Sequence, residues 1–126
     1  MQITVRIGLQ VAGMSDIAAV ATLNPEAFDI IGPITLAPAA EDVEVDLSPA
    51  SAEAQSLLLI VASVYAGTLS YKVHEDTAEP VILDKPHLFL GAQDSIAGAA
   101  FDKLFLSNSG VAATTVTFYV ARDATP

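Results

Sequence analysis

Residues 2–11 read QITVRIGLQV, and this stretch gives the clearest evidence for the fold. Isoleucine, valine and leucine occupy every odd position from Ile3 to Val11, whereas the even positions hold polar residues or glycine. Successive side chains of a β-strand point to opposite faces, so alternation with a period of two predicts a strand with one apolar face. We therefore expect this segment to form β-structure.

The same alternation recurs in three later segments. Residues 42–47 read DVEVDL, residues 69–74 read LSYKVH and residues 115–120 read TVTFYV. The last of these is rich in β-branched and aromatic residues, which suit a pleated surface. Each segment is expected to be a strand with an apolar face toward a core.

Short runs of apolar residues lie between these segments. They occupy residues 57–62, 81–83, 88–90 and 104–106. Runs this short indicate strands that are covered on both faces. We expect four further strands from them.

Turn signals separate the expected strands. They are Asn24-Pro25, Gly32-Pro33, Ser48-Pro49, Ala66-Gly67, Lys85-Pro86 and Asn108-Ser109-Gly110. Turns about 8–12 residues apart are typical of all-β sandwiches and barrels. The 126 residues are enough for one domain, so we predict a single antiparallel β-sandwich, jelly-roll-like, over residues 1–126, with residues 123–126 as a loose tail.

Helical periodicity is nearly absent. Ser15 could cap a helix over residues 15–21 and Asp94 could cap one over residues 94–100, each about two turns long. We expect no helix longer than about three turns. The connection at residues 36–40, rich in alanine and proline, is expected to be exposed.

Charge and composition exclude several classes of partner. The formal net charge is -10 and the five basic residues are scattered, whereas phosphate binding needs them clustered, so nucleic acid is not an expected partner. The two windows without charged residues, 54–71 and 104–121, are interrupted by polar residues and glycine, so no membrane-spanning helix is expected either. Only 16% of the residues are charged, which suggests that other subunits cover part of the surface.

Catalytic motifs are scarce. His74, Glu75 and Asp76 place an imidazole beside two carboxylates, with His87 further on, but the metalloprotease spacing would need a histidine at position 78, which is Ala78. We interpret residues 74–76 as a polar hairpin tip and His87 as a partly buried structural or interface residue. No nucleophile elbow or phosphate-binding glycine loop occurs, and there is no cysteine, so we predict a non-enzyme without metal or cofactor.

The acidic strip, Asp42, Glu44 and Asp46, is the candidate docking face. Alternation places its carboxylates on one side of a strand, opposite three aliphatic residues. No tight loop would bring these carboxylates together around a calcium ion. Two interpretations stay open, a solvated strand face that opposes edge aggregation and a docking face for a basic partner.

The second half of the chain contains a series of expected strands that ends in an Asn-containing turn and a Thr/Val-rich strand, at residues 56–63, 67–73, 80–91, 102–110 and 113–123. In this order of features it resembles the capsid cement or decoration proteins of tailed bacteriophages. The resemblance implies a structural virion protein on the capsid exterior, without an active site. It also implies binding to the major capsid protein as a homo-oligomer, usually a trimer or a dimer, and we take the trimer as our prediction.

The segment through Asn24 does not match that pattern. A tail or baseplate component is therefore an alternative, as is a ligand-binding β-sandwich module of non-viral origin. Sugar-binding modules of this kind usually present aromatic platforms, whereas this chain has no tryptophan and three tyrosines.

Overall fold

The computed structural model describes residues 1–47, 55–90 and 103–122. These residues form ten β-strands and no helix. The strands are β1 (Ile3–Leu9), β2 (Ile17–Leu23), β3 (Ala27–Leu36), β4 (Val43–Asp46), β5 (Gln55–Ala62), β6 (Leu69–Val73), β7 (Val81–Ile82), β8 (His87–Leu90), β9 (Lys103–Asn108) and β10 (Thr114–Arg122). The predicted all-β antiparallel fold is confirmed.

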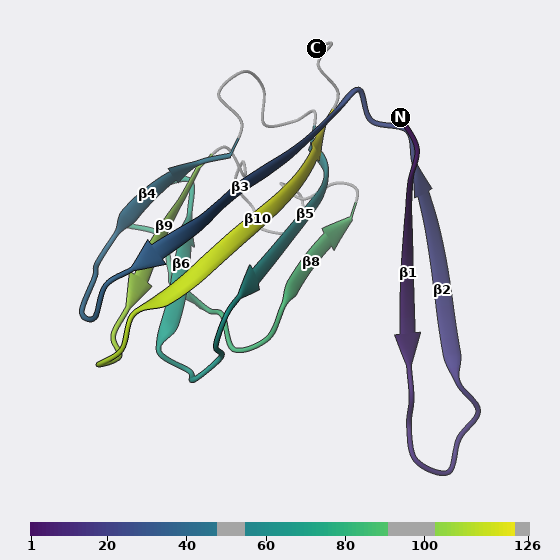
Figure 1. Cartoon of the computed structure of the whole chain (residues 1–126), viewed down its shortest axis with the longest axis horizontal. Helices are drawn as coiled ribbons and strands as arrows, with labels where there is room; N and C mark the ends of the chain where they lie inside the picture. Colours follow the sequence, from purple (N-terminus) through teal and green to yellow (C-terminus); the bar gives the residue numbers. More distant parts are fainter. Residues whose placement is uncertain (48–54, 91–102, 123–126) are drawn as a thin grey trace.

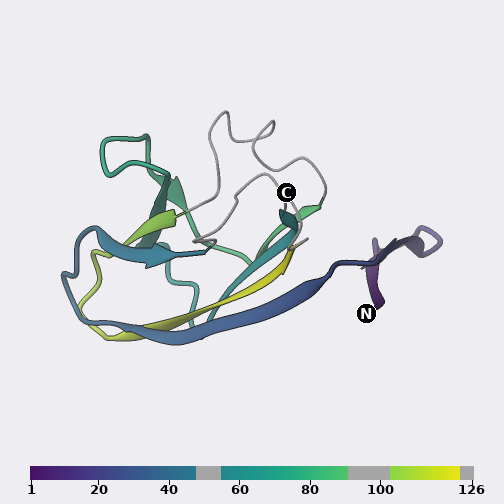
Figure 2. The same cartoon turned by 90° about the horizontal axis from the view of Figure 1, so that it is seen from above.

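Strands β3 to β10 form a sandwich of two four-stranded sheets, seen as two layers in Figure 2. One sheet has the order β3-β10-β5-β8 and the other β4-β9-β6-β7. The first of the eight strands pairs with the last, the second with the seventh, the third with the sixth and the fourth with the fifth, always antiparallel. A long hairpin rolled up so that successive pairs alternate between sheets is a jelly roll, as predicted.

The core lies between the two sheets and follows the alternation seen in the sequence. In β6, Leu69, Tyr71 and Val73 are buried while the residues between them are half-buried. In β10 the alternate residues Val116, Phe118 and Val120 are fully buried. The period of two therefore identifies the core side of these strands correctly, because each has one face toward the opposite sheet.

The prediction that the short apolar runs are covered on both faces is wrong for the edge strands. Both residues of β7, Val81 and Ile82, are exposed, and β8 has one exposed and three half-buried residues. Each of these strands lies at the end of its sheet and has one neighbouring strand. In β9 and β5 buried residues alternate with half-buried ones, with one extra buried leucine in β5.

The Gly32-Pro33 pair lies inside β3 and does not form the predicted turn. The register with β10 shifts between Val116 and Phe118, so that two residues of β3 oppose one residue of β10. This is a β-bulge, and proline is tolerated there because β3 is an edge strand. Gly32 has a φ of 110°, and a Cβ at this position would lie 2.9 Å from the Val116 carbonyl oxygen. Only glycine fits this backbone without strain.

Asn108, at the end of β9, ties together the loops at one end of the sandwich. Its side chain is fully buried; Nδ2 donates to the Ala112 carbonyl at 2.9 Å and, at longer range, to the Leu36 and Ala37 carbonyls. Its Oδ1 accepts the Gly110 N–H at 3.0 Å. The turn predicted at residues 108–110 is present, and Leu36 is buried although the connection after it is mostly exposed as expected.

The helix considered for residues 15–21 is wrong, because Ile17–Leu23 is strand β2 and pairs with β1 along its whole length. The other candidate, residues 94–100, the Ser48-Pro49 turn and the tail at 123–126 lie outside the described residues. Within the described ranges, no helix is long and apolar enough to cross a membrane.

Strands β1 and β2 form a separate two-stranded sheet, the N-terminal hairpin. It projects from the end of the sandwich where β3 begins, and both views show it standing clear of the two sheets (Figures 1 and 2). The connection to β3 is three residues, Asn24, Pro25 and Glu26. The strand with the clearest alternation in the sequence is thus a strand, but it lies outside the sandwich.

Candidate functional site

The N-terminal hairpin has one apolar face. Residues paired across an antiparallel ladder point to the same side, so the register sorts the side chains of the two strands. One face carries the pairs Ile3–Leu23, Val5–Ala21, Ile7–Ala19 and Leu9–Ile17. The other face carries Thr4–Thr22, Arg6–Val20 and Gly8–Ala18. The first set, called here the hairpin apolar face, contains no polar side chain.

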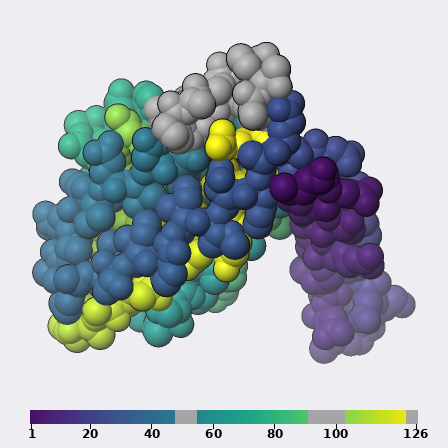
Figure 3. All heavy atoms as spheres, turned by 45° about the horizontal axis from the view of Figure 1, so that its top comes forward, coloured from purple at the N-terminus to yellow at the C-terminus, as the bar shows by residue number. Residues whose placement is uncertain are grey.

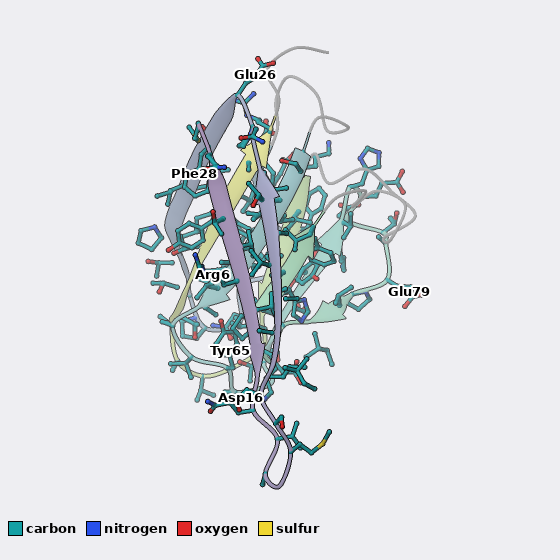
Figure 4. All side chains as sticks on the ribbon, turned by 90° about the vertical axis from the view of Figure 1, so that its right-hand side faces the viewer. Arg6, Asp16, Glu26, Phe28, Tyr65 and Glu79 are labelled. Carbon is teal, nitrogen blue, oxygen red and sulfur yellow. The ribbon has the colours of Figure 1, made fainter. Side chains whose placement is uncertain are left out.

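This apolar face is accessible along most of its length. The two pairs nearest the sandwich, Ile3–Leu23 and Val5–Ala21, are half-buried. Ile7, Leu9 and Ile17, near the turn, are exposed. The turn itself exposes Val11 and Met14. Figure 3 shows the hairpin as a separate column of atoms beside the sandwich. Figure 4 places Arg6 midway along it and Asp16 near its turn.

A second apolar surface lies on the sandwich itself. The register places the outward side chains of the β3-β10-β5-β8 sheet at Phe28, Ile30, Thr35, Thr115, Thr117, Tyr119, Ala121, Leu57, Leu59, Val61, Leu88 and Leu90. None of them is charged. This surface is called the apolar outer face, and Phe28 and Tyr119 stack on it with ring centroids 6.5 Å apart.

Exposure varies across the apolar outer face. Ile30 is 61% exposed, Phe28 and Leu88 are also exposed, and Leu59, Val61 and Tyr119 are half-buried, whereas Leu57 and Ala121 are buried, so the accessible part of the face lies around Ile30, Tyr119 and Leu88. No described strand packs on it, since the opposite sheet lies on the other side. The apolar run at residues 57–62 contained the signal for this surface, because a strand with one solvated face would carry polar residues at every second position.

The outer face of the β4-β9-β6-β7 sheet is mostly polar by contrast. Ser70 pairs with Ser107, and Lys103 pairs with Asp46 across neighbouring strands, while Phe105 and Ile82 are the apolar side chains on this face. The sandwich therefore has one mostly polar and one apolar outer face, an asymmetry that composition alone does not reveal.

The acidic strip lies on this polar side, but not as three equivalent strand positions. Asp42 precedes β4 with a φ of 49°, and its carboxylate is 2.9 Å from the Lys72 ammonium. Glu44 and Asp46 are exposed on β4, and Glu44 lies 3.9 Å from Lys103. The cations beside the strip reduce its local negative charge.

Open space borders the acidic strip. A hollow there is lined by Asp42, Lys72, Ser70 and Ser107, together with Glu41, Asn108, Ser109, Ala39, Ala40 and Pro80. None of these described lining residues is aromatic. The hollow offers hydrogen-bond donors and acceptors but no aromatic platform.

The two histidines do not meet. His74 begins the connection between β6 and β7, which pair as the hairpin expected from the sequence. His87 is half-buried in β8, where its Nδ1 and the Tyr71 hydroxyl share a hydrogen bond of 2.7 Å. Burial raises the pKa of the Tyr71 phenol to about 12, so the hydroxyl keeps its proton at neutral pH. The described residues contain no group of three or more potential metal ligands.

Comparisons with known proteins identify no relative. No protein-family model matches the chain, and neither the curated proteins nor the solved structures gave a match. The fold and the two apolar surfaces are therefore the basis for a functional proposal.

Proposed function

We propose that this chain is a structural virion protein, a cement or decoration protein that binds the exterior of a tailed-bacteriophage capsid and stabilises it. Its partners in this proposal are the major capsid protein and further copies of itself, with a homotrimer as the assembled form. It uses no cofactor and performs no reaction. It would stabilise the capsid by burying its own surface against these partners.

The observation that carries the proposal is the uncovered N-terminal hairpin. An isolated two-stranded hairpin is marginally stable in water, and an exposed apolar face of this extent marks a contact with another molecule. The exposed side chains include Ile7, Leu9 and Ile17, and large aliphatic groups are unfavourable on a surface that remains in contact with water. A chain that must be covered by other proteins fits an assembly component.

The jelly roll supports the proposal at the level of fold. Viral capsid proteins, lectins and cupins share this architecture, so it agrees with a virion role without specifying one. The resemblance of the second half to decoration proteins concerns strands β5 to β10, which are part of the same sandwich.

Labelling of purified particles tests the proposal. Antibodies against the recombinant chain are applied to tailed-phage particles produced from the genome that encodes it, and gold labels are located by electron microscopy. We expect labels on the outside of heads, and heads lacking the chain should release DNA at lower temperature. Labels confined to tails would support the tail or baseplate alternative, and absence from particles would refute a virion role.

The hollow beside the acidic strip favours a second candidate, a module that binds a small polar ligand. Ser70, Ser107 and Lys72 could donate hydrogen bonds there and Asp42 could accept them. Isothermal titration against a panel of mono- and oligosaccharides distinguishes the two functions. Binding that is lost in Lys72→Met but kept in Lys85→Met would support the ligand-binding module.

A further inference from the structure

The hairpin apolar face and the apolar outer face belong to the same chain but do not cover each other. The connection between them is short, Pro25 in it is buried, and the Glu26 N–H donates to the Arg122 carbonyl at 3.1 Å. The root of the hairpin is thereby fixed at the start of β3. The hairpin stands beside the sandwich, clear of the sheet whose outer side chains could cover it (Figures 1 and 2).

We propose that the hairpin apolar face of one copy packs on the apolar outer face of a second copy, so that each copy gives one hairpin and receives one. This proposal rests on the proposed function, because it names the two surfaces through which copies of the chain would associate. It is tested on the purified chain without particles, so its failure and the failure of the capsid role are distinguishable.

The dimensions of the hairpin set the size of this contact. Seven residues per strand give a hairpin about 24 Å long, and two strands are about 10 Å wide. The contact would therefore cover about 240 Å² on each copy, or about 500 Å² in total. Two reciprocal contacts bury about 1,000 Å², the lower bound for a specific interface, and a closed ring of three buries about half as much again.

The distribution of charge favours a second copy as the occupant. Residues 1–24 contain one basic side chain, Arg6, and one acidic side chain, Asp16, so the formal net charge of -10 lies on residues 25–126. Two such bodies repel each other at close range. A hairpin without net charge packs on the uncharged outer face of a neighbour without adding to that repulsion.

Neither surface carries a charge that opposes the contact. The outward positions of the β3-β10-β5-β8 sheet hold only apolar residues, threonine and one tyrosine, and the hairpin apolar face holds only alanine, valine, leucine and isoleucine. Arg6 points to the opposite face of the hairpin. The contact therefore desolvates no ionised group.

Light scattering on the full chain, across a range of protein concentrations, tests the proposal with two pairs of matched variants. Ile7→Asp alters the hairpin apolar face, and Val20→Asp puts the same charge on the other face of the hairpin. Ile30→Asp alters the apolar outer face, whereas Ile82→Asp alters a similarly exposed isoleucine on the polar sheet, with 61% and 59% exposure.

We expect the wild type to self-associate at micromolar concentration. Ile7→Asp and Ile30→Asp should each weaken association about 100-fold, since each puts a charge in place of an exposed isoleucine that the contact would bury. Val20→Asp and Ile82→Asp should change it by less than about threefold. Far-UV circular dichroism of all four variants establishes that each remains folded.

Mixing the two weakened variants separates this contact from a contact between two hairpins. A mixture of Ile7→Asp and Ile30→Asp allows one contact between an intact hairpin and an intact outer face, so the mixture should associate more strongly than either variant alone at the same total concentration. The proposal is overturned by a wild type that stays monomeric at every concentration. It is also overturned by Ile30→Asp associating like wild type, or by the controls weakening association as strongly as the test variants.

Discussion

Replacing Asn108 by alanine should remove more stability than any other single polar substitution considered for this chain. The side chain is fully buried, and it makes three hydrogen bonds of 3.3 Å or less, to the Leu36 and Ala112 carbonyls and from the Gly110 N–H. At about 1 kcal/mol for each bond, the loss comes to about 3 kcal/mol of unfolding free energy. For a domain of this size, that lowers the melting temperature by about 10 °C.

The measurement is urea unfolding followed by circular dichroism, at one protein concentration for all variants because self-association would add its own stabilisation. Ser109→Ala is the control. Its hydroxyl donates to the Thr68 carbonyl at 3.3 Å in an exposed position, so its loss should cost less than about 0.5 kcal/mol. A loss below about 1 kcal/mol for Asn108→Ala would refute the assignment of a structural role to this network.

Gly32→Ala should destabilise the sandwich by about 2 kcal/mol, measured by the same urea assay, because the added Cβ meets backbone in a left-handed conformation; an unchanged midpoint would contradict the bulge geometry. The Tyr71 phenol titrates near 10 when unfolded and near 12 when folded, so stability should fall as pH rises from 10 to 12, and Tyr71→Phe should flatten that fall. Replacing the acidic strip by Asn and Gln should slow association with depleted capsids and remove its salt dependence if the strip docks on a basic surface; binding that is unchanged from low to high salt would assign it to solvent.

The strands of the sandwich could be predicted because each buries one face against the opposite sheet. In residues 115–120 the alternate residues Val116, Phe118 and Val120 are the ones that enter the core. Alternation shows which face of a strand is apolar, but it does not show whether that face is covered by the same chain or by another molecule. For this reason the pattern at residues 3–11 predicts a strand correctly and leaves open whether its apolar face meets the core of its own chain.

Two local signals were overruled by strand pairing. Ser15 and the alanines after it suit a helix cap and a helix, yet Ile17–Leu23 pairs in register with β1. Gly32-Pro33 carries a turn signal, but an edge strand accommodates a bulge and a residue without an N–H. In both cases pairing with a neighbouring strand decides the conformation. That strand lies outside the few residues that carry the local signal.

The apolar outer face could not be located from the sequence either. The run at residues 57–62 indicates two apolar faces, but the position of β5 between β10 and β8 follows from the order of the sheet. Only that order shows that Leu59 and Val61 join Tyr119 and Ile30 in one surface.

The position of β10 has a consequence for the way the protein folds during synthesis. β10 lies between β3 and β5, although it is synthesised after every other strand of the sandwich. Until it emerges, β3 lacks a partner strand and one edge of β5 is open, and open strand edges are templates for aggregation. Pairing the first strand with the last also requires closing almost the whole sandwich as a loop, which makes all-β folds of this kind slow to form. A nascent chain of this protein therefore depends on its surroundings for protection until the last strand is in place.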